Sequence, residues 1–423
     1  MTEEPDEDAN WVPDRAHGLE RLKSFVPKAG ATYAKLRNYD LGPGAHDHVS
    51  TLSPWIRHRL ILEQEVVSAV LARHSFTAAT KFIQEVFWRT YWKGWLELRP
   101  SVWQDYRRRV GVLFTELERD RALRQRWEEA TSGATGISCF DVWVEELMKT
   151  GYLHNHARMW FASIWIFTLK LPWELGADFF LRNLLDGDPA SNTLSWRWVA
   201  GMQTEGKRYL ARGENIAKFT ANRFNLTTCL STVAQAVGEF SVPAPRKPPS
   251  SVTLDCTIPT GLLVTEEDLH PDLGLTQGQC FKAAAIIRTT EHRSVLDVLP
   301  KVRDFVDGAL ADTHRRLENT LESVSEILEG AHTIDCVVDW SRQHGIRQLA
   351  TPYVPVGPTA EVVRMLSDKL GSHGIRLIPT LRCWDEASWP HATAGFFKFR
   401  EKIPQVLRKV AATSASQNFF YLS

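Results

Sequence analysis

Apolar residues in the first half of the chain recur at spacings of three and four, which predicts amphipathic helices. The pattern extends from about residue 16 to residue 237 and is clearest over residues 76–98 and 140–150. The alternation typical of half-buried strands is scarce there. The longest apolar run, residues 159–169, ends at Lys170 and is shorter than the roughly 20 residues that span a bilayer, so it is expected to form a buried helix.

The pattern changes at residues 242–251, where closely spaced prolines and polar residues disfavour both helices and central strands. Beyond this segment, short apolar stretches alternate with amphipathic helical patterns, which predicts a parallel sheet covered by helices. The predicted strands comprise residues 261–265, 283–287, 348–350 and 376–379. We therefore expect a helical domain over residues 1–240, a linker over 241–252 and an α/β domain over 253–423.

Composition limits the possible classes of function. A chain of 423 residues is too long for one ordinary hydrophobic core, which agrees with two domains. Lys plus Arg and Asp plus Glu each number 50, so a nucleic-acid partner would have to bind a local basic patch. The six cysteines form no CxxC pair, and the acidic N-terminus is no secretion signal. The sequence thus predicts a cytoplasmic protein with reduced thiols and no membrane partner; its oligomeric state is left open.

Residues 186–198 read Asp-Gly-Asp-Pro-Ala-Ser-Asn-Thr-Leu-Ser-Trp-Arg-Trp and concentrate chemistry-bearing side chains. The carboxylates of Asp186 and Asp188 could bind ribose hydroxyls or ring N–H groups, and the amide of Asn192 could donate or accept beside a redox-active ring. The indoles of Trp196 and Trp198 could stack or be oxidised. Capping acids followed by core tryptophans would give the same pattern, so a redox-cofactor site and a structural segment are equal alternatives from these residues alone.

A second set lies on a predicted helix. Helical spacing places Glu85, Trp88 and Arg89 on one face. An acid and a base four residues apart usually form a surface salt bridge. With an indole between them, the same face could hold a flat polar ligand.

A third set occupies residues 154–160, His-Asn-His-Ala-Arg-Met-Trp. Asn155, Arg158 and Met159 fall on adjacent turns of a predicted helix. The two histidines of this segment are two positions apart and face different directions, so they are not expected to share a metal ion.

A fourth set is rich in hydroxyls: residues 50–54 read Ser-Thr-Leu-Ser-Pro, with the proline expected in the first turn of a helix. Backbone N–H groups and hydroxyls at such a position suit a diphosphate, although N-capping explains them equally well. Tyr33 and Arg37 add a phenol and a cation upstream. The His-Asp-His sequence at 46–48 is interpreted as a solvated loop in preference to a metal motif, so no metal site is expected.

In order and spacing, these four sets resemble the FAD-binding domain of the photolyase/cryptochrome family over about residues 33–215. The TSxLSP segment of the family falls on residues 49–54, with Val49 in place of the usual threonine. Its WREFY-like helix falls on residues 88–91, its HNRxRM segment on 154–159 and its DGDxAxNxxxWxW signature on 186–198. The resemblance implies an all-helical FAD-binding domain of the photolyase type, followed here by a small Rossmann-like α/β domain.

FAD is the cofactor that this resemblance implies. The residues that it assigns to the FAD site are Tyr33, Ser50, Thr51, Leu52, Ser53, Glu85, Arg89, Asn155, Arg158, Asp186, Asp188 and Asn192. Asn192 is expected beside flavin N5, where the family's repair enzymes carry asparagine and its plant photoreceptors carry aspartate. This residue favours repair.

The family's electron-transfer chain is matched in part. Trp196 and Trp173 correspond to its first two members. The third position, around residues 114–117, has no tryptophan. Trp103, Trp127 and Trp143 are the candidates for it.

The implied function is that of a deoxyribodipyrimidine photolyase, a lyase that repairs pyrimidine dimers in DNA by light-driven electron transfer from reduced FAD. The residues implied to contact damaged DNA are Arg37, Glu85, Trp88, Met159, Trp198 and Arg212. A lesion flipped out of the duplex would stack on aromatic side chains, at about 1–3 kcal/mol per base. The alternative is a cryptochrome-like blue-light photoreceptor that binds FAD and signals through a partner.

The neutral net charge, the reversed domain order and the weakened phosphate contacts support that alternative, and the sequence departs from the family in three ways. The α/β pattern follows the helical domain, whereas the family places it first, so we infer a reversed domain order. The α/β part is short, which leaves a second, antenna chromophore unassigned. The DNA-contacting arginine of the HNR segment is His156 here, although Arg197, Lys207 and Arg208 could rebuild a basic rim together with Arg37 and Arg212.

Overall fold

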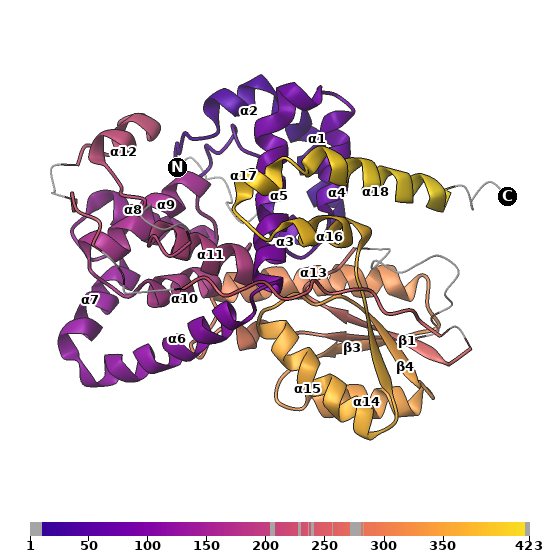
Figure 1. Cartoon of the computed structure of the whole chain (residues 1–423). Helices are drawn as coiled ribbons and strands as arrows, with labels where there is room; N and C mark the ends of the chain where they lie inside the picture. Colours follow the sequence, from indigo (N-terminus) through magenta and orange to yellow (C-terminus); the bar gives the residue numbers. More distant parts are fainter. Residues whose placement is uncertain are drawn as a thin grey trace, which may run out of the picture.

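A computed structural model describes residues 11–203, 208–226, 230–235, 237, 241–255, 257–270, 281 and 283–418. A bundle of helices comes first along the chain, and a parallel sheet with flanking helices follows (Figure 1). The helices of the first part are α1 (Arg15–Phe25), α2 (Ala31–Leu36), α3 (Ser53–Arg57), α4 (Glu63–Leu71), α5 (Phe76–Glu97), α6 (Ser101–Arg119), α7 (Arg121–Ser132), α8 (Ser138–Thr150), α9 (Asn155–Ser163), α10 (Trp173–Asn183), α11 (Pro189–Val199) and α12 (Gly213–Phe219). None of the described helices is long and apolar enough to cross a membrane. Lys207 of the expected basic rim lies outside the described residues.

Helix α5 shows why the apolar spacing predicted helices correctly. Ser75 begins it by accepting a hydrogen bond from the Ala78 N–H at 3.2 Å. Its buried positions include Ala79, Phe82 and Ile83, the three- and four-residue spacing of one helix face. The helices predicted at 76–98 and 140–150 are confirmed as α5 and α8. The apolar run at 159–169 forms the end of α9 and a buried π-helical segment, Ile164–Thr168.

Five strands form one parallel sheet in the order β3-β2-β1-β4-β5. They are β1 (Thr260–Thr265), β2 (Ala283–Ile287), β3 (Ser323–Leu328), β4 (Gln348–Pro352) and β5 (Arg376–Thr380). The four predicted strands are confirmed. The edge strand β3 was missed, because its serines and glutamate break the apolar run by which its neighbours were found.

Helices cover both faces of the sheet: α13 (Pro300–Glu318) lies above it in Figure 1, and α14 (Thr333–Gln343) and α15 (Pro358–Ser372) lie below it. Side chains of β1 alternate between the two sides. Val264 joins the core shared with α13, and Leu263 joins the core shared with α14 and α15. Because both faces are buried, the strand is apolar between its terminal threonines.

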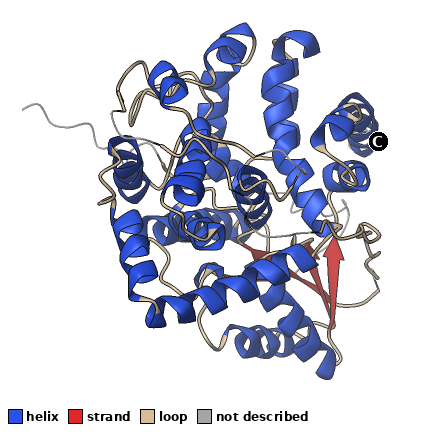
Figure 2. Ribbon diagram, turned by 60° about the vertical axis from the view of Figure 1, so that its left-hand side comes forward, coloured by secondary structure: helices blue, strands red, loops and turns tan. Residues whose placement is uncertain are grey.

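The C-terminal helices α16 (Cys383–Ser388), α17 (Phe396–Arg400) and α18 (Ile403–Asn418) return to the helical part. Trp384 stacks on Phe87 of α5 with 4.7 Å between ring centroids, and its Nε1 donates to Thr90 Oγ1 at 2.9 Å. Gly94 of α5 permits a similar approach, since a Cβ there would lie 2.7 Å from the Trp389 ring. Figure 2 shows the strands gathered on one side of an otherwise helical molecule.

The predicted linker has neither helix nor strand over residues 241–250, as expected from its prolines. It lies along the end of α5. The Arg246 N–H donates to the Leu98 carbonyl at 2.8 Å, and Arg99 Nε donates to the Pro243 carbonyl at 2.9 Å.

Candidate functional site

Residues 186–198 form a tight turn followed by α11. Asp188 is the N-cap of this helix, and its side chain accepts a hydrogen bond from the Ser191 N–H at 2.7 Å. Trp196 is 2% exposed and packs in the core. The structural alternative, a capping acid before a core tryptophan, is therefore realised here. This structural role does not exclude a cofactor role, because Asp186 and Asn192 of the same segment are held by contacts outside the helix core.

Asp186 is held by Arg158 of α9 in a two-pronged pair, with N···O distances of 3.0 and 2.9 Å. Arg158 Nε donates to the Leu153 carbonyl at 2.9 Å, which fixes the guanidinium in place. Such bidentate pairs are strong and strongly directional. The pair thus connects residues 154–160 with residues 186–198.

Asp188 lies in a buried group of positive charges on α5. Its Oδ2 is 3.4 Å from both Arg89 Nη1 and Lys93 Nζ. Burial by itself would raise the pKa of Asp188, but Lys93, Arg89 and Arg57 outweigh it and hold the pKa far below its usual range. Asp188 is therefore an anion whose Oδ2 is buried with no hydrogen bond within the described part of the chain.

The acid and base of the second set do not pair with each other. Glu85 forms an ion pair with Arg37 of α2, and Arg89 contacts Glu63 at 3.3 Å as well as Asp188. The surface salt bridge between residues 85 and 89 considered from spacing is thus wrong, because each side chain finds a partner on a neighbouring helix.

The hydroxyl-rich segment precedes α3, with Pro54 in the first turn as predicted. Thr51 has φ of 49°, a left-handed conformation that is rare for a β-branched residue. Its Oγ1 accepts a hydrogen bond from Arg21 Nη1 at 2.5 Å. No side chain caps α3, so the N-capping alternative is wrong for this described helix. Leu52 and Ser53 follow at the helix start, and Leu52 is fully buried.

A cavity of about 210 Å³ borders this segment. It is lined by Ser50, Thr51, the cations Arg21 and Lys28, and aromatic rings that include Tyr152. Tyr33 is buried nearby in α2 between Phe25 and Phe82, and burial, with Glu85 adding to it, raises the pKa of its phenol.

The two amides differ in environment. Asn155, at the first position of α9, is exposed. Asn192 is 8% exposed, and its Nδ2 donates to the Ala177 carbonyl of α10 at 2.7 Å. This bond fixes the amide so that Oδ1 is the atom left to accept from a ligand.

The residues expected to contact a lesion are not gathered around one open surface. Trp88 stacks on Phe396 of α17, with 3.7 Å between ring centroids and 12° between planes. Trp198 stacks on Tyr209 at 5.6 Å. Met159 is partly buried on α9, and Arg212 is exposed just before α12. The C-terminal segment thus packs on the Trp88 ring, and a lesion contact at Trp88 stays a prediction.

Of the expected tryptophan chain, Trp196 and Trp173 are both buried. Trp196 fits against Gly176, where a Cβ would lie 2.3 Å from its ring, and it contacts Trp165 at 6.1 Å. Trp173 stacks on Tyr106 at 5.7 Å, and Tyr106 contacts Trp103 at 5.2 Å. Among the three candidates for the outer member, Trp103 is thus connected to Trp173 through one aromatic ring. Trp143 instead stacks on Trp160, and Trp127 contacts Phe114.

Sequence reasoning missed Lys93 and Arg57. Lys93 lies four residues beyond Arg89 and eight beyond Glu85, so the same helical spacing could have added it to the second set. Arg57 pairs bidentately with Glu267, just after β1, at 2.6 and 2.7 Å. In open parallel sheets, ligands bind at the carboxyl ends of strands beside the point where strand order reverses. Here that point, between β1 and β4, is filled by Arg57.

The side chains around residues 186–192 and 50–53 fit FAD in their chemistry. Arg21 and Lys28 provide positive charge for a diphosphate, and Asn192 presents an amide oxygen. The cavity of about 210 Å³ is smaller than the roughly 300–1,000 Å³ of typical ligand sites, so it takes only part of such a cofactor in this conformation.

Comparison with known proteins identifies the same region. Residues 82–225 match the family described as the FAD binding domain of DNA photolyase. The deoxyribodipyrimidine photo-lyase of Streptomyces griseus is 33% identical over 185 residues, which are 41% of this chain and 39% of the relative. The enzyme of the same name from Escherichia coli is 26% identical over 210 residues, 48% of this chain and 42% of the relative. The chain thus spans less than half the length of these relatives.

Solved structures with similarity include a bacterial class III photolyase from Agrobacterium tumefaciens. It is 24% identical, has a TM-score of 0.42, and the alignment covers 52% of this chain and 46% of that one. A Synechocystis cryptochrome is also 24% identical, with a TM-score of 0.38 and coverage of 49% and 43%.

Proposed function

Because the helical part of this chain belongs to the photolyase/cryptochrome family, we propose that the protein binds FAD and repairs pyrimidine dimers in DNA by light-driven electron transfer from the reduced flavin. The observation that carries this proposal is the match of residues 82–225 to a photolyase FAD-binding domain. Within that stretch, Arg158, Asp186 and Asn192 are held in fixed orientations by one another or by backbone.

The proposed cofactor contacts follow from these orientations. Ser50 and Thr51, with Arg21 and Lys28 beside them, would bind the diphosphate. The Arg158–Asp186 pair would bind the ribose side, and Asn192 would accept a hydrogen bond from the ring. When bound and reduced, FAD supplies one electron to the lesion on absorbing light. Trp196 and Trp173 would carry electrons inward when the flavin must be reduced, with Tyr106 and Trp103 further out.

The proposed DNA contacts are Trp88 and Trp198 for the flipped lesion, Glu85 for its base edges, Met159 beside them, and Arg37 and Arg212 for phosphates. Four of these side chains have other partners within the protein: Phe396 covers Trp88, Tyr209 stacks on Trp198, and Arg37 and Glu85 pair with each other. Lesion binding would therefore exchange these contacts for contacts to DNA. A stacked base offers about 1–3 kcal/mol towards that exchange.

We also propose that the two parts of the chain are domains in the reverse of the family's order, divided at residues 241–252. The sheet order and the position of the helices before it support this organisation. A cytoplasmic location is proposed as well. It is supported by the free thiols of Cys139, Cys336 and Cys383 in the described part of the chain.

The repair proposal is tested with purified protein that carries bound, reduced FAD. An oligonucleotide with one cyclobutane dimer is added, the sample is illuminated with blue light, and the return of thymine absorbance is followed. We expect recovery in the light and none in the dark. No light-dependent recovery would exclude repair of this lesion and leave the photoreceptor alternative.

The role of Trp198 has a separate test. We expect Trp198→Ala to weaken binding of dimer-containing DNA by about 5- to 150-fold, the equivalent of losing 1–3 kcal/mol of stacking, while FAD stays bound. Fluorescence anisotropy with damaged and undamaged oligonucleotides measures this difference. Phe397→Ala, at a side chain that is 70% exposed, is the control. Loss of FAD in the Trp198 variant would show that this indole serves the cofactor and not the lesion.

A further inference from the structure

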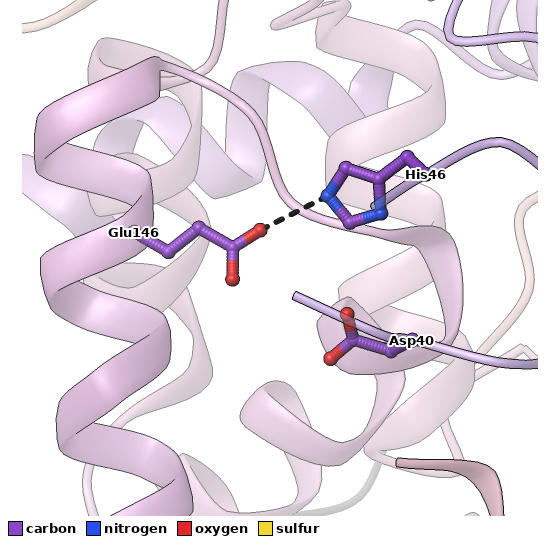
Figure 3. A group of neighbouring side chains, drawn as sticks. All are labelled: Asp40, His46 and Glu146. Carbon is purple, nitrogen blue, oxygen red and sulfur yellow. Dashed lines mark hydrogen bonds and ion pairs between the residues drawn. The ribbon is translucent and has the colours of Figure 1, made fainter. Parts of the chain in front are cut away.

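Three side chains with metal-binding atoms meet beside the cavity, and we call them the Asp40 cluster: Asp40, His46 and Glu146 (Figure 3). His46 and Glu146 line the cavity. Asp40 and His46 lie in the loop that follows α2, and Glu146 lies on α8. One atom from each lies within 4.8 Å of the others. Asp40 is fully buried, Glu146 is 3% exposed, and the side chain of His46 is 11% exposed. The interpretation of residues 46–48 as a solvated loop is therefore wrong for His46, because its ring packs against Tyr152 and His154.

Several polar atoms here lack a partner. His46 Nε2 lies 3.2 Å from Glu146 Oε1, as Figure 3 shows, but His46 Nδ1 and Glu146 Oε2 are buried without a hydrogen bond. The adjacent His154 is 1% exposed, and its Nε2 is also buried without a hydrogen bond. A buried polar atom without a partner costs about 1–3 kcal/mol, and natural structures leave few of them. Unpartnered atoms on two cluster members and on the neighbouring histidine point to a missing ligand.

Neighbouring groups hold the Asp40 carboxylate in place, and the Gly42 N–H donates to its Oδ1 at 3.2 Å. Arg223 reaches Asp40 Oδ1 at 3.5 Å, and its side chain is 26% exposed. Trp143 Nε1 donates to Asp40 Oδ2 at 3.1 Å. These contacts orient the Asp40 carboxylate and leave lone pairs on it for a further ligand, as outer partners of metal-binding carboxylates do.

We propose that the Asp40 cluster binds one divalent metal ion of the zinc class. Imidazole nitrogen and carboxylate oxygen are both zinc ligands, bound at about 2.0–2.2 Å. Binding requires the ligand atoms to draw together by roughly 1 Å from their present spread. The cavity beside His46 and Glu146 gives a fourth ligand access to the ion. This site does not depend on the repair proposal.

The test uses the full chain, freed of metal by chelation and dialysis, both without FAD and with FAD added, because the cavity beside His46 and Glu146 is also the one proposed for the diphosphate. Zinc chloride is titrated by isothermal calorimetry, and Co²⁺ is used separately as a spectroscopic probe of coordination. We expect one equivalent of Zn²⁺ to bind, and Co²⁺ to give visible absorption bands. Glu146→Gln should weaken Zn²⁺ binding by more than the about 10- to 100-fold lost with an outer partner, because it removes a ligand. Glu145→Gln, the exposed neighbour on the same helix, should bind as the unaltered protein does.

A second measurement separates loss of the site from loss of the fold. Zinc should raise the thermal unfolding midpoint of the unaltered protein and of Glu145→Gln, but not that of Glu146→Gln or His46→Gln. Absence of saturable one-to-one binding would overturn the proposal. So would equal binding by Glu145→Gln and Glu146→Gln, which would place zinc elsewhere on the chain.

Discussion

Asp188 accepts a hydrogen bond from the Ser191 N–H while its other oxygen lies 3.4 Å from Arg89 and Lys93. The first contact begins α11, and the second keeps the carboxylate ionised in a fully buried position. For Lys93, burial lowers the pKa, and the nearby Asp188 raises it by less than burial lowers it. At the scale of single residues, Asp188 thus serves both as a helix cap and as part of a buried charged group. The structural and the functional interpretation of this residue are therefore compatible.

The neighbouring Asp186 offers a sharper test of cofactor binding. Asp186→Asn replaces two charge-assisted hydrogen bonds to Arg158 by weaker ones, and such bonds contribute about 1.5–3 kcal/mol each. We expect the dissociation constant for FAD to rise by about 10- to 100-fold, measured from flavin absorbance after equilibrium dialysis. Asp105→Asn, whose side chain is 68% exposed, is the control. If both variants retain FAD equally, Asp186 does not serve the cofactor.

At the scale of elements, helix α5 organises the site. Its face with Glu85, Arg89 and Lys93 carries the charges that meet α2, α4 and α11. Phe87 and Thr90 meet the C-terminal helix α16, and Trp88 is covered by α17. One helix therefore connects the proposed flavin contacts with the segment that closes over the proposed lesion contact.

This arrangement predicts the effect of uncovering Trp88. Phe396→Ala should strengthen binding of dimer-containing DNA, by about 5- to 150-fold if the released stacking of 1–3 kcal/mol becomes available to the lesion. Phe396 is 5% exposed, so the variant should also lose about 3–5 kcal/mol of stability, and binding is measured well below its unfolding midpoint. Phe397→Ala, at a side chain that is 70% exposed, should change neither quantity. Unchanged lesion affinity in Phe396→Ala would mean that Trp88 is purely structural.

At the scale of the whole molecule, buried ion pairs join three parts of the chain. Arg57 of α3 pairs with Glu267 after β1, and Lys93 lies 3.8 Å from the same carboxylate. Arg59 links Asp268 in that loop to Asp385 of α16 at 3.3 and 2.6 Å. Removing one member of such a network leaves buried charges uncompensated. The sheet therefore helps to fix the charges around Asp188, although the family match lies outside it.

The network predicts how stability depends on pH. Burial opposes ionisation of Glu267, but Arg57 and Lys93 lower its pKa from 4.5 to about 2. Because the folded pKa lies below the unfolded one, the contribution is fully present above pH 4.5 and is lost as the pH falls towards 2. We expect a loss of roughly 3 kcal/mol over that range, measured by urea unfolding.

Glu267→Gln should remove this part of the pH dependence and cost about 3–5 kcal/mol at pH 7. Glu326→Gln, at an exposed position of β3, should keep the pH dependence of the unaltered protein. An unchanged slope in Glu267→Gln would show that other carboxylates govern acid unfolding.

The sequence by itself determined the helices, four of the five strands and the residues that share a helix face, because spacing along the chain fixes which side chains point the same way. It also indicated the resemblance to the photolyase/cryptochrome family through motifs that are continuous in the chain, and residues 82–225 match the FAD binding domain of DNA photolyase. Only the tertiary structure decided which faces meet. Phe396 lies on Trp88, Arg57 reaches Glu267, and His46 meets Glu146 100 residues away. Such pairings depend on how whole helices and loops pack. The local periodicity of the sequence does not specify which other element a helix face will contact.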